Sequence, residues 1–135
     1  MGQQQLLLII LATIVIGIAI SGAITLFQDN AVSQNRDAVM TDLTNLAARA
    51  QQYYRRPSIL GGGERQFTGL TADDNGLFKL TAKKTNDNGT YSIAVAGGPT
   101  SVVLKGVGTE RSSDGSLIEL NMTVLTDSTY VTEIH

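Results

Sequence analysis

The chain has 135 residues, of which 10 are basic and 12 acidic, so its formal net charge at pH 7 is -2. This length leaves room for one modest soluble domain beside a hydrophobic segment, and the charge excludes the broad basic face that a nucleic-acid partner requires. Cysteine is absent, which excludes disulfide bonds, thiolate metal sites and a cysteine nucleophile. A small domain without disulfides gains its stability from core burial or from neighbouring subunits, which favours an assembly.

The first 28 residues carry no charged side chain. From Leu6 to Phe27 the sequence is almost wholly apolar, and a helix over this range spans roughly 33 Å, enough to cross the hydrocarbon core of a bilayer. The opening residues Met1 to Gln5 are uncharged, whereas a secretory signal peptide begins with positive charge. We therefore expect the segment to belong to the mature protein, as a hydrophobic helix over residues 1–28.

A one-sided helical pattern follows over residues 29–56. Its apolar residues recur at intervals of three, four and seven, which places them on one stripe of a helix. They are Val32, Val39, Leu43, Leu46, Ala50 and Tyr53. Asn35, Asp42 and Arg49 fall off this stripe. Because Pro57 disfavours helical geometry in the residue before it, we predict one helix of about fifty residues that ends near Arg56.

The remainder, residues 57–135, alternates apolar and polar side chains in the manner of strands. We predict strands over 76–83, 90–96, 101–109 and 117–126, with a hairpin turn at Asn86–Gly89 and short edge strands over 66–70 and 129–134. Such an antiparallel meander of about four main strands has one apolar face. The stripe of the preceding helix is long enough to cover that face, so the predicted fold class is α+β.

An apolar half-helix, an amphipathic half-helix and a small antiparallel sheet together resemble the type IV pilin family, including the pseudopilins of secretion systems. In motif the resemblance rests on the N-terminal segment. The stretch from Tyr53 to Pro57, running into Gly61–Gly63, is also similar to pilin-type proteins of Bacteroidota and Chlorobi-like lineages. The resemblance implies a lollipop-shaped subunit with a head domain over residues 57–135.

In that family a membrane peptidase removes a short leader and the new terminal residue is N-methylated. The resemblance implies that Met1 is this residue, with cleavage between Gly2 and Gln3 as the rival placement. The family usually has a glutamate at the fifth mature position, where its charge pairs with a neighbour's N-terminal amine, but this chain has Gln5. A neutral amide would register subunits by hydrogen bonding. The alternative is that Gln3, Gln4 and Gln5 lie in the lipid headgroup region.

Glycines interrupt the apolar segment at Gly17 and Gly22, the second beside Ser21. Each costs about 1 kcal/mol relative to alanine in a helix, and filaments of this family commonly lose helicity in this zone. We predict local melting between Gly17 and Gly22 in the polymer. The alternative is that these small residues allow close packing of helices.

Two sequences match the acceptor pattern for N-linked sugar, at Asn88 and at Asn121. Both asparagines are candidate glycosylation sites. The only histidine, His135, has no partners that would make it a base or a ligand, and the Asp/Asn-rich turns lack a complete calcium loop. We expect no catalytic site, no metal and no cofactor.

The function expected from these features is structural. The resemblance implies a subunit that waits in the bacterial inner membrane and then polymerises into an extracellular type IV pilus-like filament for adhesion or motility. Its partners would be copies of itself, the prepilin peptidase and the pilus assembly machinery, and not nucleic acid. The alternatives are a pseudopilin of a type II secretion system and a single-pass membrane-anchored binding module that never polymerises.

Overall fold

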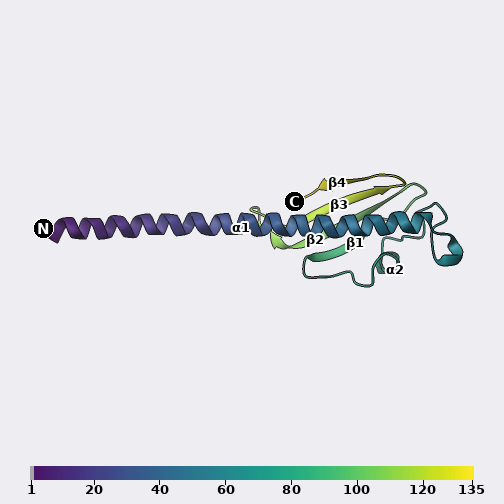
Figure 1. Ribbon diagram of the computed structural model, residues 1–135, viewed down its shortest axis with the longest axis horizontal. Coiled ribbons are helices and arrows are strands. Elements are labelled where there is room, and N and C mark those ends of the chain that lie inside the picture. The colour runs from purple at the N-terminus through teal and green to yellow at the C-terminus, as the bar shows by residue number, and fades with distance from the viewer. Residues whose placement is uncertain (1) are drawn as a thin grey trace. The chain divides into compact units, whose positions relative to one another are not determined.

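The structure, a computed structural model, describes residues 2–135 (Figure 1). Its elements in chain order are α1 (Gly2–Arg55), the 3-10 turn η1 (Ser58–Leu60), α2 (Asp74–Phe78), β1 (Gly89–Val95), β2 (Ser101–Arg111), β3 (Leu117–Leu125) and β4 (Thr129–Glu133). The chain divides into two compact units, with the boundary between Ala31 and Val32 inside α1. The predicted α+β fold class, a long N-terminal helix followed by a four-stranded antiparallel sheet, is confirmed.

The four strands form one sheet in the order β1-β2-β3-β4, and every neighbouring pair is antiparallel. The strands predicted over 90–96, 101–109, 117–126 and 129–134 are confirmed within a few residues. In β3 the alternation holds along the whole strand, because Ile118, Leu120, Met122 and Val124 are all buried. The sheet is thus a meander with one face in the core.

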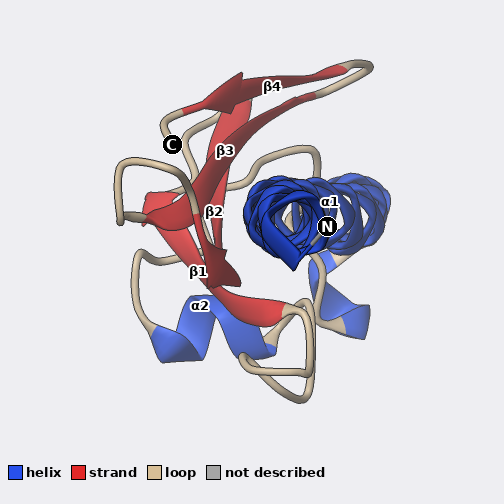
Figure 2. Cartoon of the chain, turned by 90° about the vertical axis from the view of Figure 1, so that its left-hand side faces the viewer, coloured by secondary structure: helices blue, strands red, loops and turns tan. Residues whose placement is uncertain are grey.

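The part of α1 from Val32 to Arg55 covers that face, as the view along α1 shows (Figure 2). The helix contributes Val39, Leu43, Leu46, Ala47, Ala50 and Tyr53 to the core. Gly106 of β2 allows a close approach, since a Cβ atom there would lie 2.7 Å from Cγ1 of Val39 and 3.2 Å from Cδ1 of Leu43. The predicted stripe is therefore the buried one, with Val32 half-buried at its start.

The strand predicted over 76–83 is wrong, since residues 74–78 form the short helix α2. Asp73 caps this helix by accepting a hydrogen bond from the backbone N–H of Gly76, at 2.9 Å from Oδ1. Leu77 and Leu80 are buried while Phe78 is half-exposed. A spacing of three between buried residues is helical, so the alternation in the sequence was coincidental here.

The predicted edge strand over 66–70 is also wrong. Phe67 and Leu70 are buried, but a turn separates them and their backbone groups bond to the loop that connects β1 and β2. Phe67 donates to Gly98 O at 2.9 Å, and Gly97 donates to Leu70 O at 2.8 Å. Side-chain burial alone thus produced a strand-like pattern in a segment that pairs with a loop.

The turn predicted at Asn86–Gly89 forms, but only one of its two predicted flanking strands does. Asn86 Oδ1 accepts from the backbone N–H groups of Asn88 and Gly89, at 2.9 and 3.1 Å. On the other side of the turn a single bridge joins Thr85 to Thr90. At the far end of β1 a register shift falls between Ile93 and Val95, and Val95 is exposed instead of continuing the buried face of the predicted strand.

The helix ends where Pro57 predicts. Arg55 is the last residue of α1, and the following turn closes on the end of the helix by hydrogen bonds from Gly62 N–H to Pro57 O and from Gly63 N–H to Tyr53 O. Gly61 supplies the left-handed conformation that this turn requires, at φ 77°. The helix end is therefore closed by backbone hydrogen bonds.

Candidate functional site

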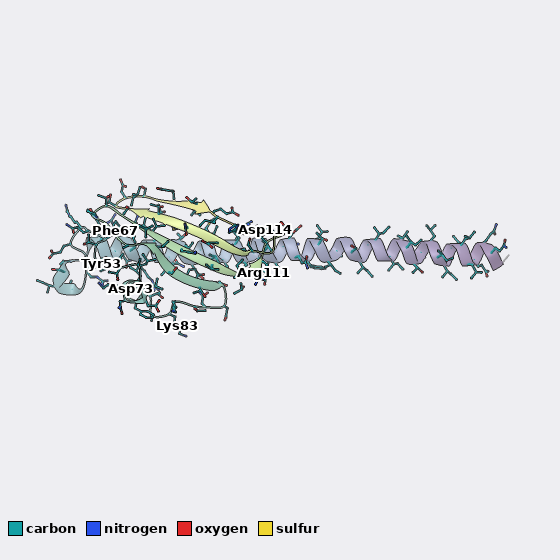
Figure 3. The ribbon with its side chains drawn as sticks, turned by 180° about the vertical axis from the view of Figure 1, so that it is seen from behind. Tyr53, Phe67, Asp73, Lys83, Arg111 and Asp114 are labelled. Atoms are coloured by element: carbon teal, nitrogen blue, oxygen red, sulfur yellow. The ribbon has the colours of Figure 1, made fainter. Side chains whose placement is uncertain are left out.

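An apolar surface surrounds the first unit. Fourteen large apolar side chains from Leu6 to Phe27 are exposed, from 53% at Ile24 to 74% at Phe27. Figure 3 shows the side chains that project from this part of α1. Because the exposed residues follow one another along the sequence without a polar stripe, the helix is apolar all round. A helix of this kind is stable only when lipid or other helices cover it.

By length and composition this segment could cross a membrane, and none of its most apolar stretch is buried within the described residues. Two of its three hydroxyl side chains, those of Thr13 and Thr25, bond to backbone carbonyl groups of the helix. Thr13 donates to Ile9 O at 2.8 Å and Thr25 to Ser21 O at 3.3 Å, each within the helix itself. The surface of this segment is therefore apolar, although the segment contains a few hydroxyl groups.

The residues singled out in this segment lie on a continuous helix. Gly17, Ser21 and Gly22 all have helical geometry, and a Cβ atom at either glycine would meet nothing within 4 Å. Their melting in a polymer therefore stays a prediction. Gln5 is exposed near the start of α1. Met1 lies outside the described residues, and its processing likewise stays a prediction.

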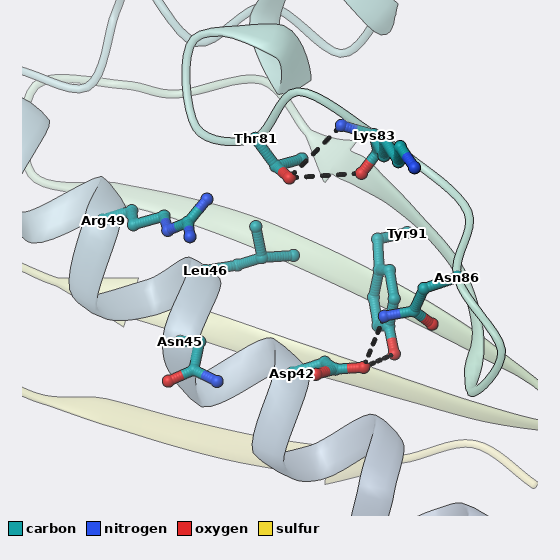
Figure 4. A pocket seen from close by; sticks show the side chains of 8 residues that line it. All are labelled: Asp42, Asn45, Leu46, Arg49, Thr81, Lys83, Asn86 and Tyr91. Carbon is teal, nitrogen blue, oxygen red and sulfur yellow. Dashed lines mark hydrogen bonds between the residues drawn. The ribbon is translucent and has the colours of Figure 1, made fainter.

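A polar network ties α1 to the loop before β1 and to β1 itself (Figure 4). One carboxylate oxygen of Asp42, Oδ2, accepts three hydrogen bonds. They come from Tyr91 Oη at 2.6 Å, Asn86 Nδ2 at 2.8 Å and Asn88 Nδ2 at 2.9 Å. Asn35 lies seven residues before Asp42 on α1. Its Nδ2 donates to Asn88 O at 2.8 Å, and its Oδ1 accepts from the backbone N–H of Thr109 at 3.0 Å. The helix is fixed by side chains that the stripe pattern places off its buried face.

The network changes the acidity of two of its members. Burial alone would raise the pKa of Asp42, but the hydrogen bonds from Tyr91, Asn88 and Asn86 outweigh it and lower the pKa below its usual value. Burial, together with the neighbouring Asp42, raises the pKa of Tyr91. Asp42 is therefore ionised and Tyr91 neutral at physiological pH, which is the state in which the phenol donates and the carboxylate accepts.

The cleft beside this network has a volume of about 180 Å³ and is mostly polar. It is lined by Asp42, Asn45, Leu46, Arg49, Thr81, Lys83, Asn86 and Tyr91 (Figure 4). The carboxylate of Asp42 accepts three hydrogen bonds on Oδ2 from donors of the same chain. Within residues 2–135 no group of three or more His, Cys, Asp or Glu side chains could hold a metal. The chemistry of this cleft is that of a tether between elements.

A second cleft, of about 260 Å³, lies further along α1 and is basic. We call it the basic cleft; it is lined by Arg49, Gln52, Tyr53, Arg56, Lys79 and Leu80. Arg49 Nη1 donates to Leu80 O at 3.0 Å, and Lys79 Nζ donates to Gly69 O at 2.6 Å. Among residues 2–135 no acidic side chain lines it. This cleft could not be predicted from a sequence pattern, because Lys79 reaches it through the fold of the chain after α2.

The candidate glycosylation sites differ in their surroundings. The side-chain nitrogen of Asn88, which would carry the sugar, donates to Asp42. Asn121 is half-buried in β3, and its Oδ1 has no hydrogen-bond partner in the part of the chain that the structure describes. His135, at the end of the chain, lies with Nδ1 3.8 Å from Oδ2 of Asp114, and both side chains are exposed. Sugar attachment at either asparagine stays a prediction.

Comparison with known proteins assigns the chain to no family. No family model matches it, and no curated protein and no solved structure is significantly similar to it.

Proposed function

We propose that this protein is the structural subunit of a type IV pilus-like filament. Subunits would wait in the inner membrane with residues 6–27 in lipid, after a prepilin peptidase has processed the N-terminus. An assembly machinery would then extract them, so that the same helices pack against one another in the filament core and the sheet units form its outside. The filament would act outside the cell, in adhesion, motility or surface attachment.

The observation that carries this proposal is the uncovered apolar surface of Leu6 to Phe27. Fourteen large side chains are more than half exposed. At about 1.5 kcal/mol each, their exposure to water would cost on the order of 20 kcal/mol, more than the net stability of most domains. Such a surface requires a permanent cover. Lipid and the apolar interior of a helix bundle are similar covers, so one segment can serve in both surroundings.

The second unit offers the rigid outer part that a filament subunit needs. Asp42 joins α1 to β1 and to the loop before it through three hydrogen bonds, which hold the helix on the sheet. A contact between unlike surfaces of successive subunits that does not close into a ring generates an open fibre. Two alternatives differ from this proposal in fibre formation: a pseudopilin forms a short fibre, and an anchored binding module stays monomeric.

Electron microscopy of fibres sheared from cells, with mass spectrometry of their N-terminus, tests the proposal. Long fibres of this chain with a methylated N-terminus support the pilus subunit. Short fibres confined to a secretion complex support the pseudopilin. A chain that stays in the membrane fraction and is monomeric in detergent supports the anchored module and contradicts the filament.

A matched pair of variants separates the apolar segment from other exposed apolar residues. Val15 and Val95 are 56% and 58% exposed, the first in the apolar segment and the second at the end of β1. An aspartate in the middle of a membrane helix costs about 3 kcal/mol. Val15→Asp is therefore expected to weaken membrane integration and fibre formation by about a hundredfold, while Val95→Asp leaves both unchanged. Equal behaviour of the two variants would contradict the role given to the segment.

A further inference from the structure

The turn that follows α1 carries the two most exposed large apolar side chains of the second unit. They are Ile59 and Leu60 of η1, which are 94% and 67% exposed. We call residues 57–63 the apolar turn; Figure 1 shows it in teal beyond the end of α1. Within residues 55–66 no other large apolar side chain is exposed. The pair therefore forms a small apolar point and not part of a broad apolar face.

Backbone hydrogen bonds fix the chain on both sides of the apolar turn. After the turn, Glu64 N–H donates to Arg56 O at 3.1 Å and Arg65 N–H donates to Tyr54 O at 2.6 Å. Glu64 and Arg65 both have positive φ, at 49° and 65°, a conformation that is costly for residues with a side chain. The returning chain thus lies along the end of α1, and it displays the two aliphatic side chains on a closed loop.

Three arginines flank the apolar turn. Arg55, Arg56 and Arg65 are exposed, and among the described residues none of them forms an ion pair or a side-chain hydrogen bond. Glu64 is the one acidic residue of residues 55–66. The base of the apolar point therefore carries a net positive charge.

The basic cleft continues this positive charge along α1. Arg56 lines the cleft together with Arg49 and Lys79. Arg49 Nη1 donates to Leu80 O, and Lys79 Nζ donates to Gly69 O. Each of these two cations keeps further N–H donors that have no partner among the described residues. Donors of this kind bind phosphate and carboxylate oxygens.

This combination matches a lipid surface better than a protein surface. Apolar side chains that enter a membrane interface are accompanied by lysine and arginine, which attract anionic headgroups. A stable protein interface buries roughly 800 Å² on each partner, and two aliphatic side chains supply only a fraction of that area. Residues 57–63 line neither of the two clefts. The pair stands on a projecting turn, which a deformable bilayer can enclose.

We propose that the apolar turn docks on the surface of an anionic lipid bilayer. Ile59 and Leu60 enter the interface, while Arg55, Arg56 and Arg65 contact the anionic headgroups. This inference goes beyond the proposed filament and does not require it, because a monomeric chain carries the same turn. The contact belongs to the second unit alone.

A fluorescent label tests entry of the turn into a bilayer, because the chain has no cysteine. Full-length Leu60→Cys, labelled with nitrobenzoxadiazole, would be held in nanodiscs of phosphatidylcholine, which cover the apolar segment. Vesicles with about one third phosphatidylserine and a nitroxide quencher on their acyl chains supply the anionic surface. We expect these vesicles to quench the label, and vesicles of phosphatidylcholine with the same quencher to leave it unchanged.

Ile134→Cys is the matched control. Ile134 is 42% exposed, and its neighbour Glu133 pairs with Arg36, which precedes Arg56 by twenty residues of α1, about 30 Å. A label at position 134 should remain unquenched. Transfer of the apolar segment from nanodisc to vesicle would affect both labelled chains alike, so the difference between positions 60 and 134 measures the turn. Equal quenching at the two positions would overturn the proposal.

Substitutions in the chain labelled at position 60 separate insertion from charge. Ile59→Asp should raise the vesicle concentration for half-maximal quenching about tenfold or more. Arg65→Gln should raise it about fivefold. Ile134→Asp and Arg111→Gln make the same kinds of change away from the turn, the second at the end of β2, and should leave it unchanged. Equal effects of Arg65→Gln and Arg111→Gln would show that net charge alone is responsible and would overturn the docking contact.

The outcomes are independent of fibre formation. Thermal unfolding of each variant first establishes that the second unit folds, which is expected because the replaced side chains are exposed. Quenching that does not depend on phosphatidylserine would overturn the anionic partner. An absence of quenching at position 60 would overturn lipid docking in favour of an acidic protein partner. Quenching at position 60 in chains that form no fibres would leave this inference standing and contradict only the filament.

Discussion

The contact between α1 and β2 at Gly106 permits a quantitative prediction. Replacement of Gly106 by alanine adds a methyl carbon that would lie 2.7 Å from Cγ1 of Val39 and 3.2 Å from Cε1 of Tyr91. Ordinary contacts between carbon atoms lie at about 3.5–4.0 Å. Both neighbours are buried, Val39 completely, so neither can move aside into solvent. We expect the helix to be pushed away from the sheet.

Overpacking of this kind costs about 1–3 kcal/mol. Alanine recovers about 0.4–1 kcal/mol by restricting the unfolded chain, so the net loss in the free energy of unfolding is about 1–2 kcal/mol. The second unit has about 100 residues, for which 1 kcal/mol corresponds to about 4–8 °C. Gly106→Ala should therefore lower Tm by about 5–12 °C.

Circular dichroism of the full chain in detergent, followed during heating, would measure this shift. Gly98→Ala is the matched control, because a Cβ there would have only Ser101 O within 4 Å, at 3.9 Å; its Tm should change little. Combining Gly106→Ala with Val39→Ala, which removes the clashing methyl group, should destabilise less than the sum of the two single changes. Equal Tm values for Gly106→Ala and Gly98→Ala would refute the close packing inferred here.

Three further predictions concern the polar network and the apolar helix. Tyr91→Phe removes the hydrogen bond to the Asp42 carboxylate and should cost about 1.5–3 kcal/mol, measured as a lower urea midpoint at pH 7; an unchanged midpoint would show that the bond contributes nothing. The pKa of Asp42 is lowered from 3.8, so the stability that this carboxylate contributes is present above pH 3.8 and is lost as pH falls through its folded pKa. The pKa of Tyr91 is raised, so the stability that this phenol contributes is present below pH 10 and is lost as pH rises above 10 toward its folded pKa. Asp42→Asn should flatten the acid side of this profile relative to wild type, and parallel profiles would contradict the assignment. A filament reconstruction should show broken helical hydrogen bonds between Gly17 and Gly22, and an unbroken ladder through residues 15 to 24 would refute the melting.

Periodicity was sufficient to predict the main elements of the fold. The stripe from Val39 to Tyr53 and the alternation in β3 are local patterns with one strong solution each, and both are confirmed. Periodicity failed over residues 76–83 because one local interaction outweighed a short alternating pattern. This interaction is the hydrogen bond from Gly76 N–H to the side chain of Asp73, which caps α2. A sequence signal for this helix was present at Asp73, because aspartate is a favoured residue at the start of a helix and accepts a hydrogen bond from the N–H three residues later.

The polar features could not be predicted in the same way. Asp42 meets Asn86 and Tyr91 across 44 and 49 residues of sequence, and Lys79 reaches the basic cleft only because α2 ends just before it. These contacts depend on tertiary packing and leave no periodic trace in the sequence. The apolar segment of the candidate site was evident from composition alone, whereas the tether and the basic cleft required the fold.

The part of α1 from Val32 to Arg55 belongs to the core of the second unit, so tension applied to the chain at Val32 acts directly on the buried side chains from Val39 to Tyr53. Pulling these residues from the sheet would expose them together and break the three hydrogen bonds at Asp42. Rupture of the second unit under tension would thus be a cooperative event.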